Sequence, residues 1–297
     1  MLGLRYLEGN SNEERLAGLL LCLKEIESNP VSPDDTGPSP SAFEQILSRL
    51  SPLFIVQLVC TDQPAASTAG VTFLSLLPDA LAVRFKEHNL LLLDNELRKD
   101  GSDGGPSNSL VFDFIVRSMK GSSPVEVTSL IEQALSRNPQ LTTPGRLLCL
   151  VADLSSLLTA PAPLSSPAQG HLRDLATQCF YLPNSPHSLR SEALGAVRIL
   201  LRTLDASWTV ESPDDPRGIG TFARLLCSIV RGEMLLLLEH TLTSQGAQST
   251  DTDSEEILVF CVDILETAIT LLVGDEASES GPWAKLPYES LLHQRQV

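Results

Sequence analysis

The chain has 297 residues, enough to bury most of its apolar surface in one large domain or two ordinary ones without disulfides or metals. Leucine accounts for 54 residues, against nine Phe, three Tyr and two Trp, and this balance predicts an all-α fold. With 37 acidic and 21 basic side chains the net charge is −16, which disfavours nucleic acids and anionic lipid surfaces as partners.

Helix-start signals recur along the chain. Ser11 with Glu14 and Ser41 with Glu44 fit the capping box, in which a hydroxyl accepts one unpaired amide and a carboxylate three residues later accepts another. Proline is tolerated in the first helical turn, so a hydroxyl residue followed by proline also predicts a start. There are five such pairs: Ser51-Pro52, Ser123-Pro124, Thr143-Pro144, Ser166-Pro167 and Ser185-Pro186. Asp253 is predicted to cap a last helix, with Glu256 as its capping-box partner.

Between these signals, apolar residues return at the three- and four-residue spacing of an amphipathic helix. The pattern runs through 87–98, 109–120, 145–159, 170–182, 219–243 and 255–273. Together with the start signals it predicts about a dozen helices of ordinary globular length.

Three of the predicted helices are apolar around more than half of their circumference. They are residues 11–25, RLLCLVADLSSLL from Arg146 and EILVFCVDILETAITLLV from Glu256. Such helices need neighbours on two sides, so we expect Leu19 and Leu20 to be packed on adjacent flanks of the first one. Starts of helix pairs recur every ~35 to 45 residues, which is typical of stacked repeats. The sequence therefore predicts one armadillo/HEAT-like helical solenoid domain over 1–297, with a single globular helical bundle as the alternative.

Four polar segments interrupt the helical pattern, near 28–40, 99–108, 210–218 and 244–254. Gly, Pro, Ser and Asp dominate them, so they bury little apolar surface, and we expect mobile loops there.

The six cysteines (Cys22, Cys60, Cys149, Cys179, Cys227 and Cys261) are scattered one to a helical segment, with no C-x-x-C pair. This spacing predicts free thiols in the core, which is typical of a reducing compartment, and we expect the protein in the cytosol. No apolar run approaches the ~18 to 20 residues that span a bilayer, so no transmembrane segment is predicted.

Two stretches resemble the neurochondrin family. Residues 14–24, ERLAGLLLCLK, are similar to that family's first helix, in which Glu-Arg precedes an aliphatic segment that ends in lysine. Residues 53–67, LFIVQLVCTDQPAAS, followed by FLSLLP at 73–78, are similar to its next helices. Here an acidic Pro/Ser segment at 29–40 replaces the basic segment that follows the first helix in the family, and the family chain is considerably longer.

The resemblance implies a cytosolic armadillo-like protein without catalytic activity that binds kinases and receptor tails in neuronal signalling and neurite outgrowth, with a location that includes neurites. A trafficking or assembly adaptor of the armadillo/HEAT type would fit the same scaffold. In either case we expect proteins or peptides as partners, preferably basic ones, although the acidity also serves to keep a leucine-rich chain in solution.

Few residue clusters point to chemistry. His240 with Glu233 and Glu239 is the least poor candidate for a metal cluster, but an exposed helix end explains these residues better. The segment RGIGTFA from Arg217 places two glycines before a helix, but it lacks the lysine and the preceding strand of a phosphate loop. The sequence thus predicts no enzyme, no cofactor, and no catalytic or metal residue, and it leaves the partner-binding residues and the oligomeric state undetermined. An enzyme or ligand carrier built in a bundle core is the alternative class.

Overall fold

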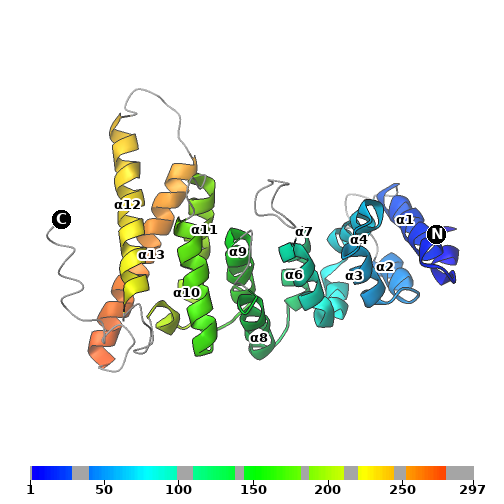
Figure 1. Cartoon of the computed structure of the whole chain (residues 1–297), viewed down its shortest axis with the longest axis horizontal. Coiled ribbons are helices and arrows are strands. Elements are labelled where there is room, and N and C mark those ends of the chain that lie inside the picture. Colours follow the sequence, from blue (N-terminus) through cyan, green and yellow to red (C-terminus); the bar gives the residue numbers. More distant parts are fainter. Residues whose placement is uncertain are drawn as a thin grey trace. The chain divides into compact units, whose positions relative to one another are not determined.

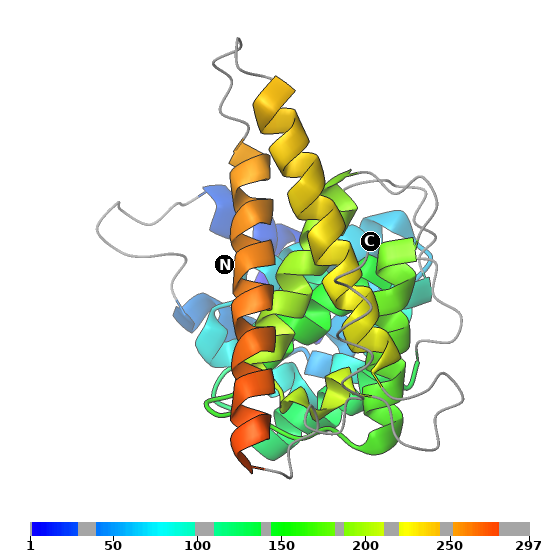
Figure 2. The same cartoon turned by 90° about the vertical axis from the view of Figure 1, so that its left-hand side faces the viewer.

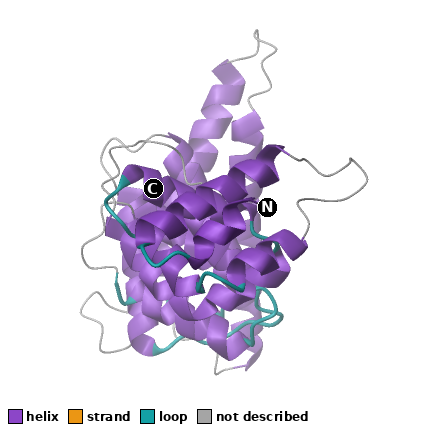
Figure 3. Cartoon of the chain, turned by 90° about the vertical axis from the view of Figure 1, so that its right-hand side faces the viewer, coloured by secondary structure: helices purple, strands orange, loops and turns teal. Residues whose placement is uncertain are grey.

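A computed structural model describes residues 2–28, 40–98, 110–137, 144–181, 187–210, 220–243 and 252–278. Within these ranges the chain forms thirteen α-helices and short 3-10 helices, and the β-pairing is one isolated bridge between Ala162 and Leu204 (Figure 3). The predicted all-α class is therefore confirmed. The chain divides into two compact units, Met1–Ser122 and Ser123–Val297, which run from blue to teal and from green to orange in Figure 1.

Unit 1 begins with a 3-10 helix that packs along the first α-helix. Its elements are η1 (Leu2–Glu8), α1 (Asn12–Ser28), α2 (Pro40–Leu47), α3 (Pro52–Val59), α4 (Pro64–Leu76), α5 (Asp79–Ala82), η2 (Val83–His88), α6 (Asn89–Arg98) and α7 (Leu110–Met119). Helix α4 contacts α1, α3 and α7, and η2 contacts α3, α6 and α7. Elements that are near in sequence thus pack together around α4 and α7.

Aromatic pairs and one arginine fix the interior of unit 1. Phe43 and Phe73 meet edge to face with ring centroids 5.5 Å apart, and Phe85 and Phe114 do so at 5.4 Å. The Arg117 guanidinium on α7 donates to the carbonyl oxygens of Leu74 and Leu77, at 2.7 and 2.8 Å. Because these carbonyls lie where α4 ends and lack helical partners, Arg117 ties α7 to the C-terminus of α4.

Unit 2 consists of longer helices. They are α8 (Pro124–Leu135), α9 (Pro144–Ser155), α10 (Ser166–Tyr181), α11 (His187–Thr203), α12 (Thr221–Thr243) and α13 (Thr252–Ser278), with the 3-10 helix η5 (Ala206–Thr209) between α11 and α12. Contacts run along two rows, from α8 through α10 to α12 and from α9 through α11 to α13, and across the pairs α8–α9, α10–α11 and α12–α13. Trp208 on η5 is fully buried against Phe222, and buried Arg173 donates to its carbonyl oxygen at 2.9 Å.

Three of the predicted helix starts have the expected cap. The Ser11 hydroxyl accepts from the Glu14 amide at 3.1 Å, while the Glu14 carboxylate accepts from the Ser11 amide at 3.4 Å. Ser123 and Glu126 form the same reciprocal box at α8. At α3 the Ser51 hydroxyl accepts from the Phe54 amide at 3.2 Å. Thr143 and Ser185 lie outside the described residues, although helices begin right after the former and close to the latter, at Pro144 and His187.

Three other starts differ from the prediction by one or two residues. Helix α2 begins at Pro40, so Ser41 lies in its first turn, where the preceding proline fits as well. Helix α10 includes Ser166, because the Gln169 amide bonds to the Ser165 carbonyl at 2.9 Å. Helix α13 begins at Thr252, which places Asp253 inside the first turn, a position that also favours a carboxylate.

The prediction that α1 is packed on both flanks is wrong. Leu19 and Leu23 are buried, whereas Leu20 and Leu21 are exposed. The burial of α1 comes from η1 and α4, which contact it. Gly18 allows the approach of η1, because a Cβ there would lie 2.8 Å from the Leu7 backbone nitrogen. One flank of the helix is covered and the neighbouring flank faces outward.

The four segments predicted as mobile loops, near 28–40, 99–108, 210–218 and 244–254, lie almost wholly outside the described residues. The single domain over 1–297 stays a prediction, and each unit is treated by itself below.

Candidate functional site

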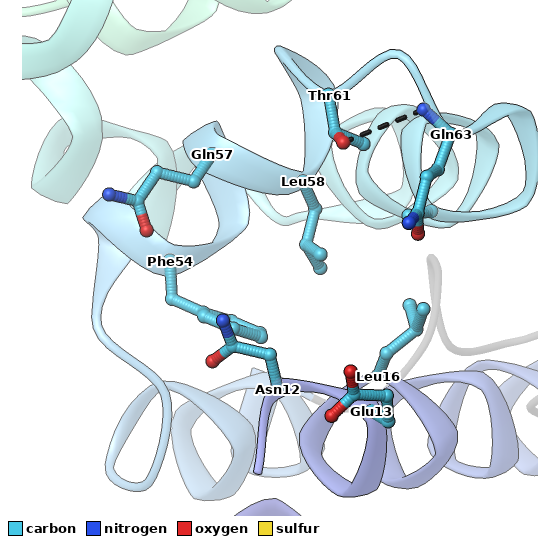
Figure 4. Close-up of a pocket in the computed structure, with 9 residues that line it drawn as sticks. Asn12, Glu13, Leu16, Phe54, Gln57, Leu58, Thr61 and Gln63 are labelled. Carbon is cyan, nitrogen blue, oxygen red and sulfur yellow. Dashed lines mark hydrogen bonds between the residues drawn. The ribbon is translucent and has the colours of Figure 1, made fainter.

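A pocket of about 260 Å³ lies in unit 1 between α1, α3 and α4 (Figure 4). Four apolar side chains form its floor: Leu16 from α1, Phe54 and Leu58 from α3, and Ala66 from α4. In Figure 4, Leu16 points up from α1 toward Leu58, which points down from α3. Phe54 and Leu58 share a face because they are one helical turn apart. The pocket thus lies between α1, α3 and α4, and apolar side chains from all three helices line it.

Close packing of α3 on α4 shapes the floor. A Cβ at Gly70 would lie 2.9 Å from the Val59 backbone nitrogen, so only glycine permits this approach. The Ser67 hydroxyl also donates to the Val59 carbonyl oxygen at 3.1 Å. These two contacts hold the C-terminal end of α3 against the first turns of α4, beside Ala66.

The rim of the pocket is polar. Asn12 and Glu13 come from the first turn of α1, Gln57 from α3, and Thr61 and Gln63 from the α3–α4 turn. The Gln63 backbone amide donates to the Thr61 hydroxyl at 3.5 Å, which orders that turn. The Ser11 and Ser51 caps fix the starts of α1 and α3, and therefore the positions of the rim residues Asn12, Glu13 and Gln57 on these helices.

The chemistry of this lining suits binding. Side-chain amides carry both donors and acceptors, which match the amide groups of a peptide backbone. Glu13 is the one ionisable residue among the nine that line the pocket, and its carboxylate is exposed at the rim, where it attracts cations. The volume of about 260 Å³ lies just below the usual range of small-molecule pockets and fits one or two side chains of a partner. The arrangement therefore favours a short apolar and basic segment as ligand.

Of the residues singled out for chemistry in the sequence, the structure describes the side chains of Glu233 and Glu239. Glu233 is buried on α12 and pairs with Arg190 at 3.3 Å, whereas Glu239 is exposed. The side chain of His240 and the segment 217–219 lie outside what the structure describes. Within the described ranges, no three His, Cys, Asp or Glu side chains gather as metal ligands would.

All six cysteines are free thiols. Burial raises the pKa of Cys149 and of Cys179 to about 12, and that of Cys261 to about 11. Because the thiolate is the nucleophile, these three side chains are unreactive at neutral pH and act as small core residues.

Sequence reasoning missed the pocket, since its lining comes from three helices and a turn. The local signal was QLVCTDQ at 57–63, where Gln57, Thr61 and Gln63 punctuate an apolar stretch. That segment contains three of the polar rim residues, but it does not indicate that residues of α1 lie opposite them.

Among the described helices, none alone combines the length and apolarity that a membrane span needs, whereas the bent pair Ser41–Leu47 and Pro52–Val59, at 88°, meets that test by length and composition. Comparison of the chain with models of protein families, with curated proteins and with solved structures gave no match.

Proposed function

We propose that the chain is a non-enzymatic interaction scaffold whose α1–α3–α4 pocket binds a short segment of a partner protein. The observation that carries this proposal is the lining of the pocket, which combines a floor of four apolar side chains with a rim of amides, a hydroxyl and one carboxylate. A lining of this kind binds a peptide by burying an apolar side chain and pairing the backbone beside it.

We further propose that the helices build an armadillo/HEAT-like solenoid. Support comes from unit 2, where contacts run along two rows of alternate helices and across consecutive pairs, as they do in stacked repeats. In a scaffold of this type each helix pair presents loops and helix starts to partners, and the pocket of unit 1 lies at such starts.

The partner should carry positive charge. The net charge of the chain is −16, and Glu13 adds a carboxylate at the pocket itself. These charges raise the rate of encounter with basic segments and disfavour acidic ones.

Residues 14–24 and 53–67 resemble neurochondrin, and most of the pocket lining lies in or beside these two stretches. We therefore propose signalling proteins, kinases and receptor tails, as the partners, in the cytosol and in neurites. A trafficking or assembly adaptor is the second candidate, because the same pocket chemistry serves transport machinery.

Site-specific photo-crosslinking tests the proposal. A photoreactive residue replaces exposed Gln57 in the full chain, and crosslinked proteins from neuronal lysate are identified by mass spectrometry. We expect a small set of signalling proteins, crosslinked through basic segments. Transport proteins in their place would favour the adaptor, and an absence of specific crosslinks would contradict the pocket as a binding site.

A charge-reversal pair provides the control. Glu13→Lys places a like charge before a basic segment and should lower the crosslinking yield severalfold. Glu27→Lys makes the same change on the same helix, about 21 Å further along, and should leave the yield unchanged. Both residues are exposed, so neither change should affect folding. Equal yields from the two variants would remove Glu13 from the site.

A further inference from the structure

Helix α13 carries two apolar stripes, and only one of them is covered. Ile257, Cys261, Ile264 and Ala268 follow each other at spacings of four, three and four residues, and all four are buried. One position further along, Leu258, Val262, Leu265 and Ile269 repeat the same spacing. Of these, Leu258, Val262 and Ile269 expose 43, 47 and 59 % of their surface. The buried stripe packs within unit 2, and the second stripe faces away from it.

Helix α12, which contacts α13, also carries exposed leucines. Leu235, Leu236 and Leu238 expose 51 to 55 % of their surface. Leu238 lies five residues before the end of α12, and Leu258 lies six residues after the start of α13. The two helices contact each other and run antiparallel, as Figures 1 and 2 show, so the α12 leucines and Leu258 lie toward the same end of the pair. We call these exposed residues of α12 and α13 together the hairpin face.

The spacing of the hairpin face fits a helix as its ligand. Apolar residues at alternating three- and four-residue steps form the seam that receives the side chains of a second helix. Amphipathic helices bind proteins by laying their apolar face on an apolar surface. An extended strand, whose side chains repeat every two residues, would not match this spacing.

The charge of α13 selects among helical partners. The helix contains seven acidic residues and no basic one over Thr252–Ser278. Glu266 lies one turn after Val262, and Glu239 lies one turn after Leu235, so carboxylates border the hairpin face on both helices. A second copy of this chain would bring an identical acidic border and another net charge of −16. A helix with basic flanks brings the complementary charge.

We infer that the hairpin face binds an amphipathic helix of a partner protein, with leucine-like residues at heptad spacing and Lys or Arg on both flanks. This surface belongs to unit 2 and is separate from the pocket of unit 1. The inference stands whether or not the pocket binds a peptide, and Glu13→Lys should leave binding at the hairpin face unchanged.

Fluorescence anisotropy with model helices tests the inference on the full chain. The probe is a labelled peptide of about three heptads with Leu at a and d, Lys at e and g, and Ala or Gln elsewhere. We expect micromolar binding of this peptide. Binding should be at least tenfold weaker for a version with Glu at e and g, and for a scramble of the same composition that lacks the heptad period. Equal binding of the scramble would overturn the inference, because it would show attraction by net charge alone.

Matched variants locate the binding. Leu258→Ser with Val262→Ser removes two exposed side chains of the hairpin face and should weaken binding at least tenfold. Leu91→Ser with Leu110→Ser removes two equally exposed leucines from unit 1 and should change nothing. Glu239→Lys with Glu266→Lys should weaken binding of the Lys peptide and strengthen binding of the Glu peptide. Unchanged affinities in the first and third pairs would also reject the inference.

Photo-crosslinking from position 262 of the full chain identifies the occupant directly. An adduct with the Lys peptide supports the inference. A dimer of the chain would assign the face to a second copy, and a crosslink to residues of the same chain would assign it to an internal contact, and either result would overturn the inference.

Discussion

Helices α9 and α13 have the same kind of sequence and different surroundings. Both are apolar around more than half of their circumference. In α9 the buried residues, among them Leu148, Leu150 and Leu154, cover more than half of the circumference, because α8, α10 and α11 contact it, and Asp153 is exposed on the remaining side. In α13 the burial is confined to one stripe, and the parallel stripe is exposed. A helix that is apolar around most of its circumference therefore needs neighbours on several sides. In α13 the exposed stripe is the side on which we propose that a partner protein packs.

The largest expected effect concerns the two sides of α9. Leu148 and Leu150 point in nearly opposite directions, and both are buried. Replacing either one by alanine leaves a cavity, which should lower the free energy of unfolding by about 2 to 5 kcal/mol. Urea denaturation followed by circular dichroism measures this loss for each variant. A loss below about 0.5 kcal/mol at one of the two positions would mean that α9 is not packed on the side of that leucine.

The thiols of the two helices give a second prediction. Burial raises the pKa of Cys149 on α9 to about 12 and that of Cys261 on α13 to about 11. The ordinary thiol value is 9.0. Above pH 9 the unfolded chain therefore loses protons that the folded chain keeps. Each thiol then lowers stability by about 1.4 kcal/mol per pH unit until its folded pKa is reached.

Urea denaturation between pH 8 and pH 10.5 checks this prediction. The wild type should lose stability as the pH rises through 9, and Cys149→Ala and Cys261→Ala should each reduce the slope by the contribution of one thiol. Between pH 7 and pH 8 the thiols are protonated in both states, so neither substitution should change the pH dependence there. A slope that is unaltered in Cys149→Ala would show that this thiol ionises in the folded protein.

Local signals in the sequence predicted most of the fold, and the neighbours of each helix were harder to foresee. Capping at Ser11, Ser51 and Ser123 involves residues within three positions, so the sequence contains the whole interaction. The exposure of Leu20 depends on η1, which covers α1 from one side only and which no hydrophobic period announced. The run of leucines in α1, from which we predicted packing on two sides, was therefore also compatible with packing on one side.

The pocket was less predictable for the same reason. Its rim residues Gln57 and Gln63 are near in sequence, but Asn12 and Glu13 reach them only through the packing of α1 on α4. A short polar stretch between two apolar helices is also typical of an ordinary turn, and only the position of α1 shows that it borders a pocket. The hairpin face was partly predictable. The sequence shows that α13 is apolar around most of its circumference, but it does not show which side of the helix is exposed.

The smallest expected effect completes the comparison within α13. Leu258 is exposed, so replacing it by alanine leaves no cavity and should change the free energy of unfolding by no more than about 0.5 kcal/mol. Ile264, six residues further on, is buried in the neighbouring stripe, and its replacement by valine should lower the free energy of unfolding by about 0.5 to 1.5 kcal/mol. Urea denaturation at several protein concentrations distinguishes the two positions. If Leu258→Ala lowered stability more than Ile264→Val, and the loss grew with protein concentration, a second copy of the chain would already cover the exposed stripe. A small effect at every concentration would leave that stripe free for the basic helix, because substituting a residue that only a partner covers weakens binding and leaves folding intact.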